Sequence, residues 1–171
     1  MPCYQPLEGY RSRAVGPSGK RRIVFNASEG YRDLAVKVAC GQCIGCRLEK
    51  SRQWAMRCVY EASLYEDNCF ITLTYDDDHL PMGSGLDPGS HQRFMKRLRK
   101  RYGSGIRFYH CGEYGDRVGR PHYHTLLFNH DFSDKVPFKE TGSGEIIYTS
   151  DSLRSLWPFG FSSIGAVTFE S

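Results

Sequence analysis

Two histidines separated by a single residue are the part of this sequence best suited to chemistry. His122 and His124 fall in the run 122–128, whose aromatic, β-branched and leucine residues predict a β-strand. Side chains of a strand alternate between its two faces, so both imidazoles point to one side and Tyr123 points to the other. Such pairs also occur without a ligand, so the spacing alone leaves a metal site and two half-exposed histidines as alternatives.

A carboxylate on the preceding segment favours the metal site. Residues 106–113 predict another strand, and the turn-rich stretch 114–121 predicts a hairpin between the two. In that pairing Glu113 lies opposite His122 and Cys111 lies opposite His124, and opposed residues share a face. Glu113, His122 and His124 then form a divalent-metal site with open positions for water or phosphate oxygens. We expect Mn²⁺ or Mg²⁺ there, acting as a Lewis acid on a phosphodiester.

Three cysteines at two-residue gaps indicate a second metal site. Cys40, Cys43 and Cys46 have the spacing of a zinc knuckle, which needs a fourth ligand, and Cys3 can supply it. A structural Zn²⁺ that holds the N-terminal arm to the start of the first helix is the preferred interpretation. Reduced structural cysteines and a redox pair remain the alternatives. The odd total of seven cysteines, without a signal peptide, argues against the disulfide framework of a secreted protein.

Basic side chains gather on two predicted helices. The net charge of +4 is modest, but residues 93–101 hold six basic residues and no acidic one. Because a polyanion responds to the nearest charges, nucleic acid is the natural partner, although a solvated basic helix face is the alternative. Trp54 suits base stacking and core packing equally well. The residues predicted to contact DNA are Arg47, Lys50, Trp54, Arg57, Lys96, Arg97, Lys100 and Arg120.

Positioning these residues requires a sheet with helices beside it. Apolar periodicity predicts helices over 47–66 and 90–102, a short helix from residue 150 or 151 to Pro158, and strands over 69–75, 106–113, 122–128, 146–149 and 161–169. The predicted fold is α+β, with a central, mostly antiparallel sheet of about five strands flanked by helices. Residues 1–39 look irregular and predict a loosely built arm.

Length and composition indicate one folded domain. The 171 residues favour a single domain, divided into a cysteine-containing arm over 1–46 and an α/β core over 47–171. The hydrophobic fraction of 40% and the aromatic fraction of 13% exclude a disordered chain. No apolar stretch is long enough to cross a bilayer, so we expect a soluble, intracellular protein without a membrane partner.

Five short motifs occur in a joint order that is specific, although each is weak alone. They are Cys40-Gly41-Gln42-Cys43, Arg52-Gln53-Trp54-Ala55, Thr72-Leu73-Thr74-Tyr75, Gly112-Glu113-Tyr114-Gly115 and Gly119-Arg120-Pro121-His122-Tyr123-His124. Together they resemble the replication initiators of gokushoviruses, which are small single-stranded-DNA phages of the microvirus group. The similarity runs across essentially the whole chain.

The resemblance implies an HUH endonuclease that initiates rolling-circle replication. In that superfamily a histidine pair around a bulky hydrophobic residue binds the metal, and His122, Tyr123 and His124 match it, with Glu113 as the acidic ligand. A tyrosine attacks the origin phosphate, stays joined to the 5′ end and leaves a 3′-OH for the polymerase. The resemblance further implies single-stranded origin DNA and the host replication machinery as partners, in the cytoplasm of a bacterial host.

One departure from the family concerns the nucleophile. The family's catalytic tyrosine follows the strand that matches residues 166–171, and none of the eleven tyrosines here lies in such a motif. We therefore expect a segment truncated before that helix, which binds DNA and metal but nicks poorly. Two other functions stay open: a non-catalytic, zinc-stabilised module that binds single-stranded DNA, and a metal-dependent hydrolase of small phosphoesters that uses water.

Overall fold

The computed structural model describes residues 3–115 and 119–168, apart from the side chain of Ser84. The chain divides into two compact units, Met1–Trp54 and Ala55–Ser171. None of the helices in the described ranges combines the length and the apolar content that a membrane span requires.

The first unit contains a small antiparallel sheet where the sequence predicted an irregular arm, and that prediction was wrong. Strands β1 (Leu7–Ser12), β2 (Ile23–Val24) and β3 (Gly30–Val38) lie in the order β2-β1-β3. Among the described residues of this unit, Val24 is the one buried hydrophobic side chain. Backbone hydrogen bonds between the strands therefore contribute more to this sheet than burial of apolar side chains does. Helix α1 (Ile44–Ala62) begins in this unit.

The second unit is built on a six-stranded sheet within its described residues. The strands are β4 (Asn68–Thr74), β5 (Arg107–Tyr114), β6 (Pro121–Phe128), β7 (Val136–Glu140), β8 (Ile146–Thr149) and β9 (Ser162–Gly165). Their order is β5-β6-β4-β9-β8-β7, and each neighbouring pair is antiparallel. This confirms the predicted α+β fold with an antiparallel sheet. Strand β7 lies outside the strands predicted from the sequence, and it forms an edge of the sheet, a position where proline is tolerated.

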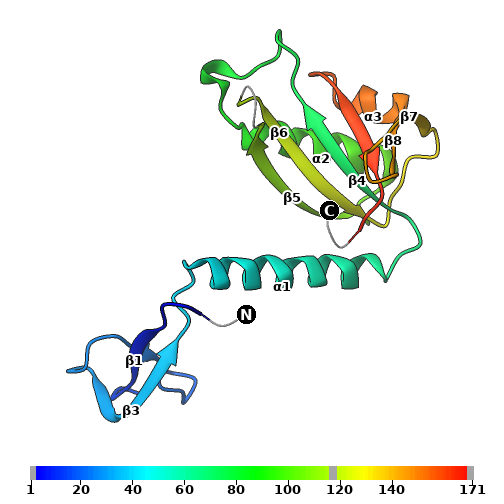
Figure 1. Cartoon of the computed structure of the whole chain (residues 1–171). Helices are drawn as coiled ribbons and strands as arrows, with labels where there is room; N and C mark the ends of the chain where they lie inside the picture. Colours follow the sequence, from blue (N-terminus) through cyan, green and yellow to red (C-terminus); the bar gives the residue numbers. More distant parts are fainter. Residues whose placement is uncertain (1–2, 116–118, 169–171) are drawn as a thin grey trace. The chain divides into compact units, whose positions relative to one another are not determined.

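Two helices cover one face of this sheet and enclose the main core. Helices α2 (Pro88–Tyr102) and α3 (Asp151–Leu156) pack against it (Figure 1), and a short 3₁₀ turn, Met82–Ser84, precedes α2. The core between them centres on fully buried side chains, namely Ile71, Leu73, Phe94, Leu98, Leu127, Leu153, Trp157 and Ile164. On the opposite face a smaller cluster joins Cys58 from the end of α1 to Leu126 and Phe128.

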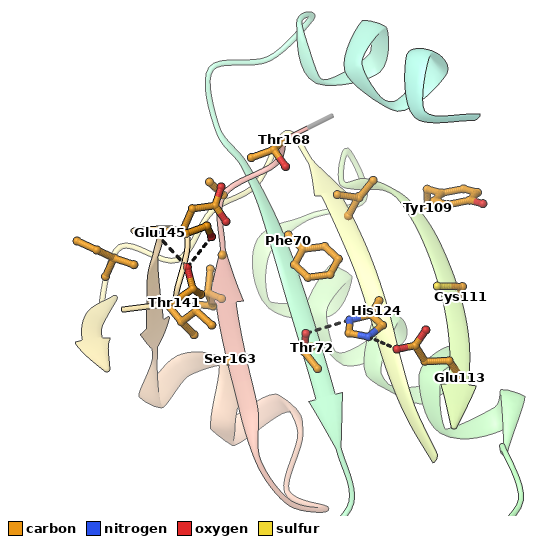
Figure 2. Close-up of a pocket in the computed structure, with 17 residues that line it drawn as sticks. Phe70, Thr72, Tyr109, Cys111, Glu113, His124, Thr141, Glu145, Ser163 and Thr168 are labelled. Carbon is orange, nitrogen blue, oxygen red and sulfur yellow. Dashed lines mark hydrogen bonds and ion pairs between the residues drawn. The ribbon is translucent and has the colours of Figure 1, made fainter. Parts of the chain in front are cut away.

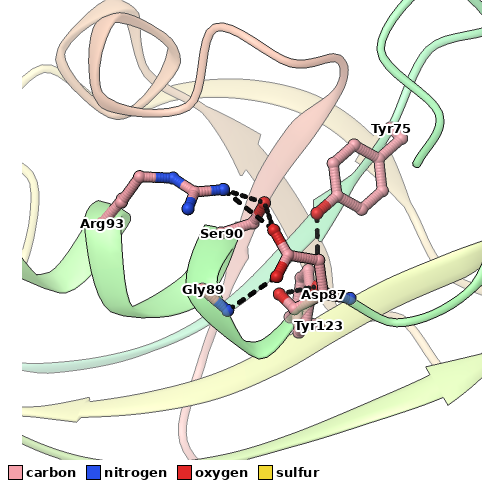
Figure 3. A network of polar contacts seen from close by, with 6 residues as sticks. All are labelled: Tyr75, Asp87, Gly89, Ser90, Arg93 and Tyr123. Atoms are coloured by element: carbon pink, nitrogen blue, oxygen red, sulfur yellow. Dashed lines mark hydrogen bonds and ion pairs between the residues drawn. The ribbon is translucent and has the colours of Figure 1, made fainter. Parts of the chain in front are cut away.

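The residue between the two histidines ties β6 to the start of α2. The Tyr123 hydroxyl donates to the Asp87 carbonyl at 2.7 Å and accepts the Asp87 N–H at 3.0 Å, with the Tyr75 hydroxyl 3.2 Å away (Figure 3). The Asp87 carboxylate caps the helix by accepting from Gly89 N–H and from the Ser90 hydroxyl. Tyr123 thus fixes the strand that carries both histidines against a rigid element.

Charge is distributed unevenly between the two units. The sequence of the first unit contains ten Lys and Arg residues and four Asp and Glu residues, whereas that of the second contains thirteen and fifteen. The positive net charge of the whole chain therefore comes from the first unit.

Candidate metal centre and the groove beside it

The histidine pair and Glu113 meet on the face of the sheet opposite α2. Strands β5 and β6 pair with Glu113 opposite His122 and Cys111 opposite His124, which confirms the predicted register. On the other side of β6, Thr72 of β4 lies opposite His124. The two imidazoles and the carboxylate therefore come from adjacent strands whose backbones are hydrogen-bonded, which fixes their spacing.

The ligand atoms of these three side chains are close enough to share one ion. Glu113 Oε1 lies 2.7 Å from His122 Nε2 and 2.9 Å from His124 Nε2, and the three ligand atoms lie within 4.8 Å of one another. The imidazole side chains are 16% and 24% exposed, while the carboxylate side chain is 54% exposed. The cluster thus has protein on the histidine side and solvent access on the glutamate side.

The other nitrogen of each imidazole is held by a neighbouring group. His122 Nδ1 lies 3.1 Å from the Arg120 carbonyl, and His124 Nδ1 lies 3.0 Å from Thr72 Oγ1. A carbonyl only accepts, so His122 Nδ1 carries a proton, and Nε2 is the nitrogen that faces Glu113. A proton on Nε2 makes this contact a hydrogen bond to the carboxylate, and a metal ion bound between the two atoms would take the place of that proton. The donor set therefore fits a divalent cation, with second nitrogens fixed as in known metal-bound histidines.

Electrostatics keep the carboxylate in its ligating form. Hydrogen bonds from His122 first, and from His124 next, hold the pKa of Glu113 below its usual value. Burial, with a smaller contribution from the Glu113 charge, raises the pKa of the nearby Cys111 thiol. At neutral pH Glu113 is therefore ionised and Cys111 is protonated, which makes the carboxylate the better ligand.

The turn before β6 positions His122 through its backbone. Gly119 has a φ of +62°, a conformation that favours glycine, and Gly115 N–H donates to the Arg120 carbonyl at 3.0 Å. The Arg120 guanidinium donates to the Tyr75 carbonyl at 2.9 Å and pairs with Asp77. These contacts of Arg120 stabilise the turn beside the cluster. Its predicted contact with DNA stays a prediction.

A groove of about 610 Å³ runs across the sheet from this cluster (Figure 2). His124 and Glu113 line one end, and residues of the β7–β8 hairpin such as Thr141 and Glu145 line the other. The Phe70 ring stacks on the His124 ring, with centroids 5.3 Å apart and planes 10° apart. Further lining side chains are mostly hydroxyl-bearing or apolar, among them Thr72, Tyr109, Cys111, Leu126, Ser143, Ser163 and Thr168. The groove is shaped for an extended ligand with both polar and apolar parts.

The structure does not bring the basic residues of α2 to this groove. Helix α2 packs against the face that carries Tyr123, whereas the histidines point from the opposite face. Arg97 Nε donates to the Leu156 carbonyl at 2.9 Å, while Lys96 and Lys100 are exposed. On α1, Arg47, Lys50 and Trp54 are exposed in the first unit and Arg57 is exposed in the second. Their DNA contacts remain predictions.

Sequence reasoning missed two side chains that contact His124. Thr72 and Phe70 were assigned to a strand, but its pairing with β6 was not predicted. Phe70 and Thr72 are two residues apart in the run 69–75, so they share one face of the strand. Once the pairing of this strand with β6 is known, that face is the one that carries the histidines. The predicted cysteine ligands do meet: the sulfur atoms of Cys3, Cys40, Cys43 and Cys46 lie within 4.8 Å of one another.

Comparisons with known proteins agree with the predicted resemblance to phage replication proteins. The chain is 34% identical over 180 residues to the replication-associated protein VP4 of Bdellovibrio phage phiMH2K, which covers 100% of this chain and 55% of the relative. It is 35% identical over 143 residues to the replication-associated protein ORF2 of Spiroplasma virus 4, covering 78% and 45%. The replication-associated protein ORF4 of Chlamydia phage 1 is 32% identical over 152 residues, covering 82% and 38%.

The chain spans about half the length of the curated relatives that it matches, and no solved structure matches it. The family model described as replication-associated protein ORF2/G2P matches residues 68–171, a stretch that includes every strand of the larger sheet and the whole histidine and glutamate cluster. The chain therefore belongs to the replication-associated protein ORF2/G2P family.

Proposed function

We propose that this chain supplies the metal-binding and DNA-binding part of an HUH-type nickase that starts rolling-circle replication at a phage origin. The observation that carries the proposal is the convergence of His122 Nε2 and His124 Nε2 on one oxygen of Glu113. The relatives' names, which describe replication-associated proteins of phages, support a substrate of phage DNA. The host replication machinery as partner and the bacterial cytoplasm as location belong to the same proposal.

The protein groups at this cluster have separate tasks. The Arg120 carbonyl and the Thr72 hydroxyl hold the Nδ1 atoms, which leaves both Nε2 atoms directed at the ligand position. Glu113 supplies negative charge that attracts a cation, and its exposed side leaves room for a phosphate oxygen. Mn²⁺ or Mg²⁺ bound here would supply Lewis-acid stabilisation of the charge that develops on the scissile phosphate.

The groove provides the surface for the DNA strand. Base stacking is tolerant of sequence and needs exposed aromatic rings, and Phe70 and Tyr109 both line the groove. Hydroxyl groups such as Thr168 and Ser163 suit phosphate and sugar contacts. We propose that single-stranded DNA lies along this groove with its scissile phosphate beside Glu113.

The nucleophile in this proposal is a tyrosine downstream of residue 171, as the family resemblance implies. Its phenolic oxygen forms a bond to phosphorus while the bond from phosphorus to the 3′ oxygen breaks, which gives a 5′ phosphotyrosine and a free 3′-OH. The protein groups described above position the phosphate for this displacement but take no covalent part in it.

A covalent-adduct assay on the chain extended through the downstream tyrosine helix tests the proposal. With origin DNA and Mn²⁺, we expect a protein–DNA adduct that disappears in the double variant His122→Ala, His124→Ala. An adduct formed equally by the variant, or formed without divalent metal, would contradict the proposal. Unchanged DNA affinity without any adduct favours the binding module, and hydrolysis of a generic phosphodiester without an adduct favours the water-dependent hydrolase.

A further inference from the structure

Four cysteine sulfurs cluster in the first unit, away from the histidine and glutamate residues in sequence. Cys3 Sγ lies 3.6 Å from Cys40 Sγ and 3.8 Å from Cys43 Sγ, and all four sulfurs, including that of Cys46, lie within 4.8 Å of one another. Each of the four side chains is partly buried. Three strands, β1, β2 and β3, separate Cys3 from the other three cysteines in the chain, so this grouping is a product of the fold.

The two sulfur–sulfur distances of Cys3 are those expected in a tetrahedral metal site. A disulfide holds its sulfurs about 2.05 Å apart, far closer than the distances seen here, and all four thiols are free. With Zn–S bonds of about 2.3 Å, the sulfurs of a tetrahedral site lie about 3.8 Å apart. The distances between Cys3 and its two neighbours match that edge length.

Backbone N–H groups around the cluster point at the sulfurs. Cys40 N–H donates to Cys3 Sγ at 3.3 Å, Cys43 N–H donates to Cys40 Sγ at 3.3 Å, and Tyr4 N–H donates to Cys43 Sγ at 3.4 Å. Gly41 makes this turn possible with a φ of +75°. Donors of this kind stabilise thiolates, which are the ligating form of cysteine, over thiols.

The cluster sits where the ends of the small sheet meet the start of α1. Cys3 precedes β1, Cys40 follows β3, and Cys46 lies in the first turn of α1. Val24 is the one buried hydrophobic side chain in the described part of this unit, so packing alone contributes little to its stability. Units of this size without a core usually depend on a metal or on disulfides.

We propose that Cys3, Cys40, Cys43 and Cys46 bind one structural Zn²⁺ that holds the N-terminal unit together. Binding converts the thiols to thiolates and releases their protons to solvent. Four protein ligands leave no open position, so this ion is structural and distinct in role from the cation at Glu113. The inference stands on the first unit alone, and its failure would leave the proposed nickase function untouched.

Metal content and thiol reactivity of the whole chain test this site. For protein purified without added metal, mass spectrometry should find about one Zn²⁺ per chain, and replacement by Co²⁺ should give the visible and near-ultraviolet bands of a tetrahedral tetrathiolate. Thiol reagents should leave the four clustered cysteines unmodified until a strong chelator is added. Hydrogen exchange of the β1 and β3 amides should rise when the ion is removed.

Substitutions at the cluster and away from it test whether these four cysteines bind the ion. Cys46→Ser should lose the bound Zn²⁺, whereas Cys111→Ser, which changes a cysteine of the larger sheet, and the double variant His122→Ala, His124→Ala should keep it. Cys46→His preserves a zinc ligand and should restore binding, which separates ligand loss from misfolding. Full Zn²⁺ occupancy in Cys46→Ser, disulfides among the four cysteines, iron in place of zinc, or clustered thiols that react without a chelator would each overturn the proposal.

Discussion

The Nδ1 atom of His124 lies 3.0 Å from the hydroxyl oxygen of Thr72 on the neighbouring strand β4. This contact orients the imidazole and leaves Nε2 directed at Glu113. The equivalent contact of His122 is to a backbone carbonyl, which no substitution removes. Thr72 is therefore the side chain through which the orientation of the pair can be tested.

Replacing Thr72 with valine should weaken metal binding without unfolding the protein. The substitution keeps the shape and removes the hydroxyl, and loss of such a partner typically costs about 10–100-fold in metal affinity. Titration calorimetry with Mn²⁺ measures the effect. Thr74→Val is the matched control, because its hydroxyl makes no hydrogen bond to any residue that the structure describes. Equal affinities for the two variants would show that Thr72 has no positioning role.

Glu113→Gln should reduce Mn²⁺ affinity by at least about 10-fold, because it removes the charge of a ligand while keeping its size. Glu145 lines the same groove at its other end, so Glu145→Gln controls for the loss of one negative charge. We expect that control to stay within about twofold of the parent chain, since a solvated charge farther away is largely screened. Similar losses in both variants would point to a general charge effect in place of ligation.

The stability of the larger unit should fall as pH drops from about 6.5 to about 4. His91 is 1% exposed, and burial, with a smaller effect of His110, lowers its pKa to about 4. At pH values between the pKa of His91 in the unfolded chain and its pKa in the folded chain, the imidazole is protonated only in the unfolded chain. Lowering the pH through this range therefore favours unfolding. The contribution is about 3 kcal/mol at full effect.

Urea unfolding of the parent chain and of His91→Gln across this pH range isolates that contribution. Glutamine does not titrate and can still hydrogen-bond the Thr125 hydroxyl, which lies 2.9 Å from His91 Nε2. The variant should show a shallower loss of stability between pH 6.5 and 4. Parallel curves for the two proteins would show that His91 titrates alike in the folded and unfolded chains.

Phe70→Leu should weaken binding of single-stranded oligonucleotides. Leucine keeps apolar packing against the sheet but removes the ring, and stacking on an aromatic ring is worth about 1–3 kcal/mol per base. Fluorescence anisotropy with an oligothymidine should show a loss of about fivefold or more. Phe138→Leu, an exposed aromatic on the edge strand β7, should bind like the parent chain. A larger loss in the Phe138 variant would move the DNA-binding surface to the sheet edge.

Local patterns predicted the elements that position the cluster. Helix α2 was predicted over 90–102 from apolar periodicity, which Phe94 and Leu98 carry, and Gly103 ends the helix with a φ of +104°. The opposition of Glu113 to His122 followed from strand alternation across a short turn. Both depend on residues near one another in the chain, where propensity and spacing are informative.

Features that depend on distant pairing were not predictable in this way. The contact between Thr72 and His124 joins residues 52 positions apart, and it requires that β4 lie beside β6. In the small sheet of the first unit, Val24 is the one hydrophobic side chain that is buried. Because this sheet covers no core, its sequence has no need of the regular alternation of apolar and polar residues from which strands are predicted. For the fourth zinc ligand, the sequence offered Cys3 as a candidate, and its contacts with Cys40 and Cys43 depend on the fold of the first unit.

If the chain binds DNA as proposed, the uneven distribution of charge gives its two units different parts in that binding. Ten basic against four acidic residues lie in Met1–Trp54, whereas the unit that carries the groove has slightly more acidic than basic residues. Long-range attraction of a polyanion then originates in the N-terminal unit, and the groove contributes short-range recognition. Under the proposed function, we therefore expect the salt dependence of DNA association to be set mainly by the basic residues of Met1–Trp54.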